Sequence, residues 1–157
     1  MPVLSIIVPV YNVATYLREG LDSILRQEVQ DIEVICVDDC SSDSSPDILK
    51  EYQAKDNRIQ FIRQSENKGP SATRNIGIKY AKGKYIAFCE GDDYWIDPLK
   101  LQKQVDFLES NTDYSMSHTN NICYNQKKRI FVRDVGERKK EEIGNGLTCE
   151  DIIKYNR

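Results

Sequence analysis

Three carboxylates fall within four residues at Glu90-Gly91-Asp92-Asp93, directly after an apolar run of strand length. Alternate side chains of an extended chain share a face, so Glu90 and Asp92 would project together. Two carboxylates about 4 Å apart repel by about 4 kcal/mol at an effective dielectric near 20. A divalent cation with oxygen ligands, Mg²⁺ or Mn²⁺, would relieve this repulsion and suit a phosphate site. A solvated acidic loop between a strand and a helix explains the same residues.

Other residues near predicted strand and helix ends have side chains that suit a nucleotide. Arg74 lies near the start of a predicted helix, where free amide groups favour an anion, and it can make a forked contact to a phosphate. Tyr11 could stack on a base, Asp39 could accept a hydrogen bond from a base or ribose, and Lys68 could face a diphosphate. The structural alternatives are a surface arginine, a half-buried tyrosine, an Asx turn and an exposed lysine.

The elements that would position these residues alternate along the chain. Apolar, β-branched runs predict strands over residues 4–10, 32–38, 59–63 and 85–89. Helical spacing predicts helices over residues 14–26, 45–54, 71–83 and 98–111. This order predicts right-handed βαβ units and a mainly parallel sheet. The polar segments 9–12, 38–39 and 90–93 would then meet at the carboxyl edge, where such sheets bind ligands.

Local signals give finer expectations for the ends of these elements. Pro9 lacks an N–H donor and is expected to end its strand. Ser45 and Ser71 are expected to cap helices with their hydroxyl groups. Leu101, Val105 and Leu108 face inward, and so do Ala72, Ile76 and Tyr80 of the helix after Ser71. Residues 114–120 and 122–132 look extended, 136–146 look like a loop, and Thr148 caps a last helix.

The overall composition narrows the class of protein. The chain has 157 residues, 39% hydrophobic and 30% charged, which is typical of a globular domain. A net charge of -3 with scattered basic residues argues against nucleic-acid binding. Five cysteines without a C-x-x-C pair, and a single histidine, argue against a zinc site and indicate reduced thiols. Without an export signal or a long apolar run, the chain is expected to be cytoplasmic, possibly at the inner membrane face.

The common nucleotide-binding loops are missing from the sequence. It contains neither G-x-x-x-x-G-K-[ST] nor G-x-G-x-x-G, so a P-loop ATPase or a dinucleotide fold is not indicated. The charge of a diphosphate would instead be met by a cation, a helix end and Arg or Lys side chains. This combination suits a diphosphate leaving group, because a metal can act as a Lewis acid on the departing oxygen.

Four ordered segments resemble family 2 glycosyltransferases of the GT-A fold: L-S-I-I-V-P-V-Y-N from Leu4, V-D-D-C-S-S-D from Val37, N-K-G-P-S-A-T-R-N-I-G from Asn67 and F-C-E-G-D-D from Phe88. The resemblance covers about residues 4–110 and implies a Rossmann-like α/β/α sandwich with a mainly parallel sheet. It implies transfer of a sugar from a nucleotide-diphospho-sugar, with a UDP-sugar as the expected donor. The acceptor would be a hydroxyl group of a glycan, of a lipid-linked molecule or of another compound. The reaction would be inverting, dependent on Mn²⁺ or Mg²⁺, and part of polysaccharide or cell-surface glycan synthesis.

The resemblance also assigns residues. The nucleotide sugar would be held by Pro9, Tyr11, Asp39, Lys68, Arg74 and Asp92. Asp93 would coordinate the metal, with Asp92 beside it. The family usually has aspartate at the position of Glu90 and often glycine at that of Cys40. Because glutamate is longer, direct metal contact by Glu90 is not expected.

The family's catalytic base lies on the acceptor side, later than Arg157, so the chain is expected to stop short of the family's full domain. It would form one GT-A-like domain over residues 1–157, with the nucleotide-sugar half at 1–110 and the start of the acceptor half at 111–157. Two alternatives remain. One is a non-catalytic nucleotide-sugar-binding fragment. The other is a receiver-like signalling domain, which also binds Mg²⁺ through aspartates at strand ends.

Overall fold

The computed structural model describes residues 1–119, 123–125 and 130–132. Its elements in chain order are β1 (Leu4–Val10), α1 (Ala14–Leu25), β2 (Ile32–Asp38), α2 (Ser45–Lys55), β3 (Ile59–Arg63), α3 (Pro70–Tyr80), β4 (Tyr85–Phe88), α4 (Lys100–Ser110), β5 (Cys123–Asn125) and β6 (Ile130–Val132). The predicted alternation of strands and helices is confirmed, and the α/β class with it.

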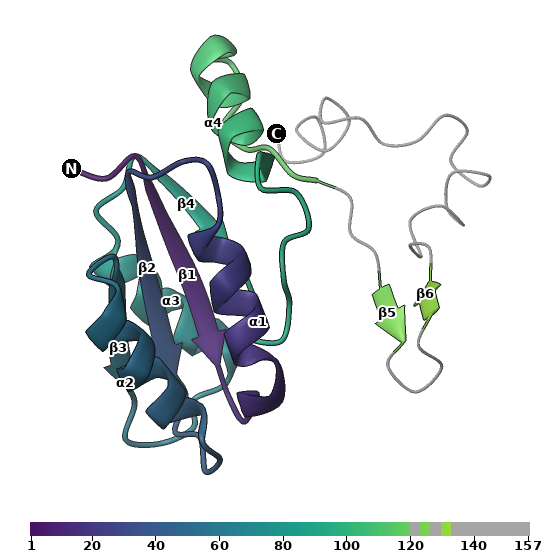
Figure 1. The fold of residues 1–157 in the computed structure, drawn as a ribbon. Coiled ribbons are helices and arrows are strands. Elements are labelled where there is room, and N and C mark those ends of the chain that lie inside the picture. The colour runs from purple at the N-terminus through teal and green to yellow at the C-terminus, as the bar shows by residue number, and fades with distance from the viewer. Residues whose placement is uncertain (120–122, 126–129, 133–157) are drawn as a thin grey trace. The chain divides into compact units, whose positions relative to one another are not determined.

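β1 to β4 form one parallel sheet in the order β3-β2-β1-β4 (Figure 1). Val10 stands beside Asp38, and Asp38 beside Arg63, so three strands end level with one another. On the other side of β1, the ladder with β4 ends at the pair Ile7 and Phe88. Receiver domains have the strand order 2-1-3-4-5, whereas 3-2-1-4 is the order of the Rossmann type. The receiver-like alternative is therefore wrong.

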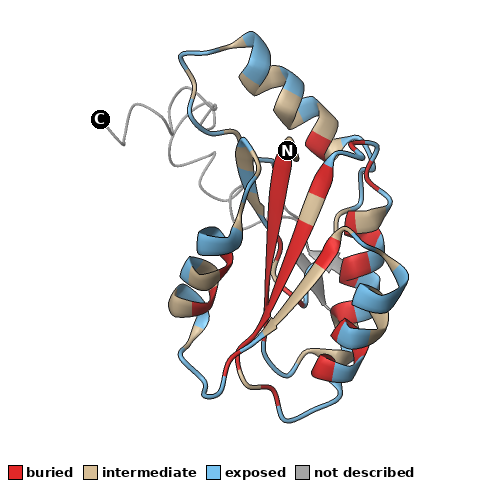
Figure 2. Ribbon diagram, turned by 90° about the vertical axis from the view of Figure 1, so that its left-hand side faces the viewer, coloured by how far each residue is buried: buried red, intermediate tan, exposed pale blue. Residues whose placement is uncertain are grey.

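β1 is buried along its whole length because strands flank it and helices cover both faces. Ile6 and Val8 belong to the core that also holds Leu17 of α1 and Leu49 of α2. Ile7 points the other way and packs against Gly77 of α3. Figure 2 shows the buried strands between helices on either side. This is the predicted α/β/α sandwich.

β1 does not stop at Pro9 as the sequence predicted. The strand continues to Val10, with Pro9 opposite Val37 in the ladder with β2. The carbonyl of Pro9 faces away from β2 and accepts a hydrogen bond from Gly91 N at 3.1 Å. The missing N–H therefore lies beyond the end of the β4 ladder, where no strand hydrogen bond is required of it.

The predicted serine caps are also wrong. α2 starts at Ser45 itself, and its N-cap position, Ser44, makes no side-chain cap bond. The Ser45 hydroxyl instead accepts a hydrogen bond from Val13 N at 3.1 Å, which ties the β1–α1 loop to α2. α3 starts at Pro70 after Gly69, whose φ of 81° is a conformation that favours glycine, and it has no side-chain cap. Ser71 lies inside this helix and is exposed.

The inward face of α3 differs from the prediction as well. Thr73 and Gly77 are its buried residues, whereas Tyr80 is 47% exposed. A Cβ added to Gly77 would lie 2.4 Å from Ile7 Cγ2, so this glycine lets the helix approach the sheet closely. Ala72 and Ile76 are only partly buried. Side chains on β4 that share the α3 side of the sheet, Ile86 and Phe88, are about half exposed.

The chain divides into two compact units, residues 1–103 and 104–157, and the expected division near residue 110 stays a prediction. Leu101 of α4 is buried as predicted, while Val105 and Leu108 are partly buried. In the second unit, Phe107 contacts Tyr114 edge to face at 5.2 Å between ring centroids.

The expected extended segment at 114–119 forms no strand. Within the expected extended segment 122–132, β5 and β6 pair as an antiparallel ladder. The expected loop at 136–146 and the helix from Thr148 lie outside the described residues. None of the helices among the described residues is long and apolar enough to cross a bilayer.

Candidate functional site

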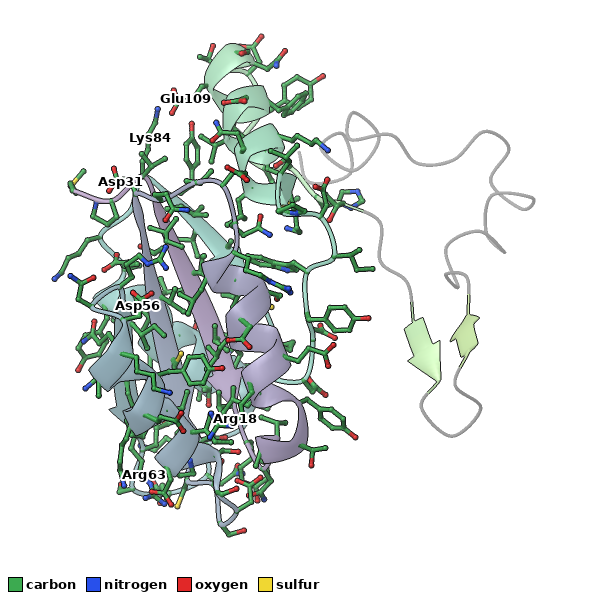
Figure 3. The ribbon with its side chains drawn as sticks, in the orientation of Figure 1. Arg18, Asp31, Asp56, Arg63, Lys84 and Glu109 are labelled. Atoms are coloured by element: carbon green, nitrogen blue, oxygen red, sulfur yellow. The ribbon has the colours of Figure 1, made fainter. Side chains whose placement is uncertain are left out.

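The segments that follow the strands continue side by side at the carboxyl edge. Asp39 N donates to Val10 O at 2.8 Å, Gln64 N to Asp38 O at 2.9 Å, and Gly91 N to Pro9 O at 3.1 Å. The strand order reverses between β1 and β4, and ligands of such sheets bind in the crevice at that point. Figure 3 marks this edge by Arg63, while Asp31 and Lys84, which directly precede β2 and β4, mark the opposite edge.

Asn12 joins the loops after β1 and β2. Its side-chain Oδ1 accepts hydrogen bonds from Ser42 N at 2.8 Å and Asp43 N at 3.3 Å. Its own N–H donates to Ser41 Oγ at 3.0 Å, and its φ is 53°. Asp43 in turn accepts from Ala14 N at 2.9 Å, so it stabilises the start of α1. These contacts fix the loop that carries Tyr11, whose side chain is 50% exposed beside the edge.

Asp38 is the last residue of β2 and Asp39 follows it, and both are buried. The Asp38 carboxylate pairs with Arg63 Nε at 3.2 Å and accepts from Ser41 N at 3.2 Å, so it is Asp38 that holds the turn into the serine loop. The Asp39 carboxylate bonds across the edge instead, to Gln64 Nε2 at 2.7 Å and to the backbone N–H groups of Lys68 and Gly69, both at 2.8 Å. The Asp39 carboxylate therefore does not form the Asx turn that was the structural alternative for this residue.

Gln64 connects this loop to α3. Its Nε2 also donates to Thr73 Oγ1 at 2.9 Å, and the Thr73 hydroxyl donates to Gly69 O at 2.8 Å. Thr73 directly precedes Arg74 on α3, so the same bonds that hold Asp39 also fix the helix that carries the arginine. Sequence reasoning missed both residues. Gln64 follows a strand end and could have been found by that rule, whereas Thr73 carries no such signal.

Arg74 is the fifth residue of α3, because the helix starts at Pro70, one residue before the predicted start at Ser71. Its guanidinium pairs with Glu90: Nη2 lies 2.6 Å and Nε 3.0 Å from the same oxygen, Oε1. Both side chains are about one-third exposed, 37% for Arg74 and 35% for Glu90. The contact joins α3 to the acidic segment after β4.

The acidic segment is a tight turn in which Asp93 N donates to Glu90 O at 3.0 Å. Gly91 is buried inside it, and an added Cβ would lie 2.9 Å from Val13 Cγ2 and 3.0 Å from Pro9 O. Gly91 therefore permits a close approach to its own chain. Partial burial raises the pKa of the Asp93 carboxyl above its usual value, and the negative charges of Asp92 and Glu90 raise it further. The carboxylates thus lie close enough to repel one another.

The residues fit a divalent cation in one respect. Glu90 gives its Oε1 to Arg74, which leaves Asp92 and Asp93 as two exposed carboxylates that make no ion pair within the described residues. Oxygen donors of this kind, with water and phosphate oxygens, are what Mg²⁺ or Mn²⁺ takes. Among the residues that can be described, no group of three or more Asp, Glu, His or Cys side chains forms a complete metal site. A bound diphosphate would have to supply the remaining ligands.

Direct contacts connect several of the predicted site residues with each other or with neighbouring residues of the edge. Asp39 contacts the backbone of Lys68, Arg74 contacts Glu90, and Pro9 contacts the acidic turn through Gly91. The Lys68 side chain does not point into this network, because its Nζ lies 3.4 Å from Glu66. Tyr11 is placed at the edge by its loop and, within the described residues, makes no hydrogen bond to Asp39 or Arg74.

The chain is similar to known proteins in sequence and in fold. The family model described as Glycosyl transferase family 2 matches residues 5–152. The putative teichuronic acid biosynthesis glycosyltransferase TuaG of Bacillus subtilis is 40% identical over 107 residues, 68% of this chain and 42% of that protein. The chain spans less than half the length of the first curated relatives that it matches.

Two solved structures share the fold. S. aureus TarS 1-349 in complex with UDP-GlcNAc has 34% sequence identity and a TM-score of 0.65, covering 71% of this chain and 32% of that one. The mannosyltransferase PcManGT from Pyrobaculum calidifontis, in complex with GDP-Man and Mn²⁺, has 26% identity and a TM-score of 0.66, covering 71% and 33%.

Proposed function

Because the chain belongs to glycosyl transferase family 2, we propose that it binds a nucleotide-diphospho-sugar at the carboxyl edge of its sheet, and that the protein transfers the sugar to an acceptor hydroxyl. The observation that carries this proposal is the continuous set of contacts from Asp39 through Gln64 and Thr73 to α3, and from Arg74 to the acidic turn. A base-binding end and a phosphate-binding end are thereby held on one edge.

The two ends divide the work of binding. Tyr11, half exposed beside the edge, stacks on the base, and Pro9 and Asp39 lie beneath the nucleoside. Arg74 and Lys68 meet the diphosphate, and Asp92 approaches the ribose. Asp93, with Asp92, holds a divalent cation whose chemistry is to neutralise the diphosphate leaving group. Lys68 must leave Glu66 to do this, which is inexpensive because both side chains of that ion pair are exposed.

The nucleotide is proposed to be UDP. An ionised carboxylate has about four acceptor positions, and the Asp39 carboxylate already receives three N–H groups, two on Oδ1 and one on Oδ2. A single position remains on Oδ2, which suits the one N–H of uracil better than the adjacent donors of guanine. The TarS complex with UDP-GlcNAc supports this choice, while PcManGT shows that the fold also accommodates GDP-Man. UDP should therefore bind more tightly than GDP.

The catalytic base is not assigned. Asp97 is poorly suited to the role, because a hydrogen bond from Lys103, with one from Leu99 N, lowers its pKa and weakens it as a base. The acceptor is proposed to be a cell-surface glycan or its lipid-linked precursor, handled with inversion at the cytoplasmic side of the membrane. The name of TuaG, a putative teichuronic acid biosynthesis glycosyltransferase, supports an acceptor of this class.

The test is calorimetric titration of UDP with and without Mn²⁺. Tight binding that requires Mn²⁺ and is lost in Asp93→Asn supports the proposal. Asp31→Asn is the matched control, because Asp31 is an exposed aspartate at the opposite edge of the sheet. Binding that ignores both the metal and Asp93→Asn would contradict the proposal. A non-catalytic binding fragment remains the second candidate, and release of UDP from UDP-sugar in the presence of an acceptor would refute it.

A further inference from the structure

Glu90 lies in the acidic turn proposed to bind the cation, yet its carboxylate contacts the Arg74 guanidinium. Both nitrogens on one side of the guanidinium, Nε and Nη2, point at the same Glu90 oxygen, at 3.0 Å and 2.6 Å. Charge-assisted hydrogen bonds of this length are among the stronger ones. Glu90 is also anchored through its backbone, since its carbonyl accepts from Asp93 N at 3.0 Å. The acidic turn and the arginine therefore share one rigid connection.

The same geometry leaves part of the arginine available. A guanidinium has five N–H donors in a fixed fork. The Nε side is used by Glu90, while Nη1 makes no hydrogen bond in the part of the chain that the structure describes. An arginine held by one side in this way can offer its other nitrogen to a phosphate oxygen without first losing its rotational freedom.

We propose that Glu90 is a positioning residue, which holds Arg74 for the diphosphate and does not ligate the cation. The inference rests on the proposed function. It assigns two roles in the turn to different carboxylates: positioning of the arginine and binding of the cation. Asp92 and Asp93 are exposed and make no ion pair within the described residues, so they are the available ligands. Glu90 reaches Arg74 because its side chain has one methylene more than an aspartate.

The opposite arrangement makes different predictions. If Glu90 ligated the cation, it would have to release Arg74, and aspartate would serve as well at this position. If Glu90 merely competed with the diphosphate for Arg74, removing its charge would strengthen binding. Under the positioning role, Glu90→Gln and Glu90→Asp should both weaken UDP binding, because one removes the charge and the other shortens the reach by about 1.5 Å.

The experiment measures UDP affinity and Mn²⁺ affinity separately in the 157-residue chain. Calorimetry with saturating Mn²⁺ gives the UDP affinity of wild type, Glu90→Gln, Glu90→Asp, Arg74→Gln and the double variant Glu90→Gln/Arg74→Gln. Titration of Mn²⁺ at fixed UDP, followed by the electron paramagnetic resonance of free Mn²⁺, gives the metal affinity. We expect about tenfold weaker UDP binding in both Glu90 variants, and a metal affinity within about twofold of wild type for Glu90→Gln. The double variant should bind UDP no more weakly than Arg74→Gln alone.

The competing outcomes overturn the proposal in distinct ways. A loss of Mn²⁺ affinity in Glu90→Gln as large as that in Asp93→Asn would make Glu90 a metal ligand. Normal UDP binding by Glu90→Asp, stronger binding by Glu90→Gln, or additive losses in the double variant would equally overturn the positioning role. If wild type binds no UDP, the proposed function fails together with this inference, whereas wild-type binding with any of the other outcomes overturns the inference alone. Thermal unfolding of each variant checks that these partly exposed positions tolerate the changes.

Discussion

Asp39→Asn tests whether the carboxylate that we propose for the nucleoside also holds the fold together. The carboxylate receives three N–H donors, from Gln64 Nε2, Lys68 N and Gly69 N, at 2.7, 2.8 and 2.8 Å. Asparagine keeps one acceptor oxygen and replaces the other by an NH₂ group. If that oxygen keeps the two contacts of Oδ1, the NH₂ group faces the Gly69 N–H, and two donors then oppose each other.

The magnitude follows from the bond that is lost. A hydrogen bond to a charged group contributes about 1.5–3 kcal/mol. Gly69 N has a second acceptor, Asn67 Oδ1 at 3.1 Å, so it is not left wholly without a partner. We therefore expect a loss of about 2–3 kcal/mol in the free energy of unfolding. For a chain of this size that corresponds to a fall in Tm of roughly 5–10 °C.

The assay is thermal and urea unfolding followed by circular dichroism at neutral pH, with Asp31→Asn as the control. The control should change stability by less than about 0.5 kcal/mol, because an exposed aspartate is removed. A second variant, Gln64→Ala, removes a different donor to the same side chain, so it should couple with Asp39→Asn non-additively because both changes act on one hydrogen-bond network. An Asp39→Asn protein that melts with wild type, yet loses UDP binding, would refute the structural part of the reasoning.

Three further predictions concern other parts of the edge. Burial alone would raise the pKa of Asp43, but hydrogen bonds from Ala14 N and Ser45 lower it in the folded protein. The stability that wild type gains over Asp43→Asn should therefore be complete above the ordinary pKa near 4 and should vanish as pH falls through the lower pKa of the folded state. Urea unfolding from pH 7 to pH 2 measures this difference. Gly20→Ala would favour an isolated helix, but it should destabilise the fold and weaken Mn²⁺-dependent UDP binding, because the new Cβ would lie 2.7 Å from Asp93 O. UDP binding equal to that of wild type in calorimetry would contradict this prediction. Burial raises the pKa of Cys36 and of Cys89 to about 12, so mass mapping at pH 8 should find Cys40, which is only partly buried, alkylated by iodoacetamide well before either of them.

The sequence was informative where the physical signal was local and repeated. Uninterrupted β-branched runs such as residues 4–10 and 32–38 predicted buried parallel strands, and their common direction predicted that polar segments would meet at one edge. The packing face of α3 could not be predicted, because Gly77 is buried by the close approach of Ile7 and not by its own hydrophobicity.

Hydroxyl and charge partners were the other limit. Ser45 has the right neighbours for a helix cap, but its hydroxyl is taken by Val13 N, 32 residues earlier in the chain. The Arg74–Glu90 pair joins residues 16 positions apart on different elements, and sequence spacing gives no measure of that distance. The three donors to Asp39 come from a loop whose conformation depends on Gly69 at positive φ. Each of these contacts requires the fold before it exists.

Charge compensation along the edge connects these observations with the proposed cation. Four carboxylates there are satisfied from within the protein: Asp38 by Arg63, Asp39 and Asp43 by N–H donors, and Glu90 by Arg74. Asp92 and Asp93 follow in the same turn and have no such partner among the described residues, while the pKa of Asp93 is raised by its partial burial and by its neighbours' charges. Among the described residues of the edge, negative charge therefore remains uncompensated at this turn, next to the arginine suited to phosphate. A cation brought by a nucleoside diphosphate would balance both groups at once, because it would meet the carboxylates on one side and the phosphate oxygens on the other.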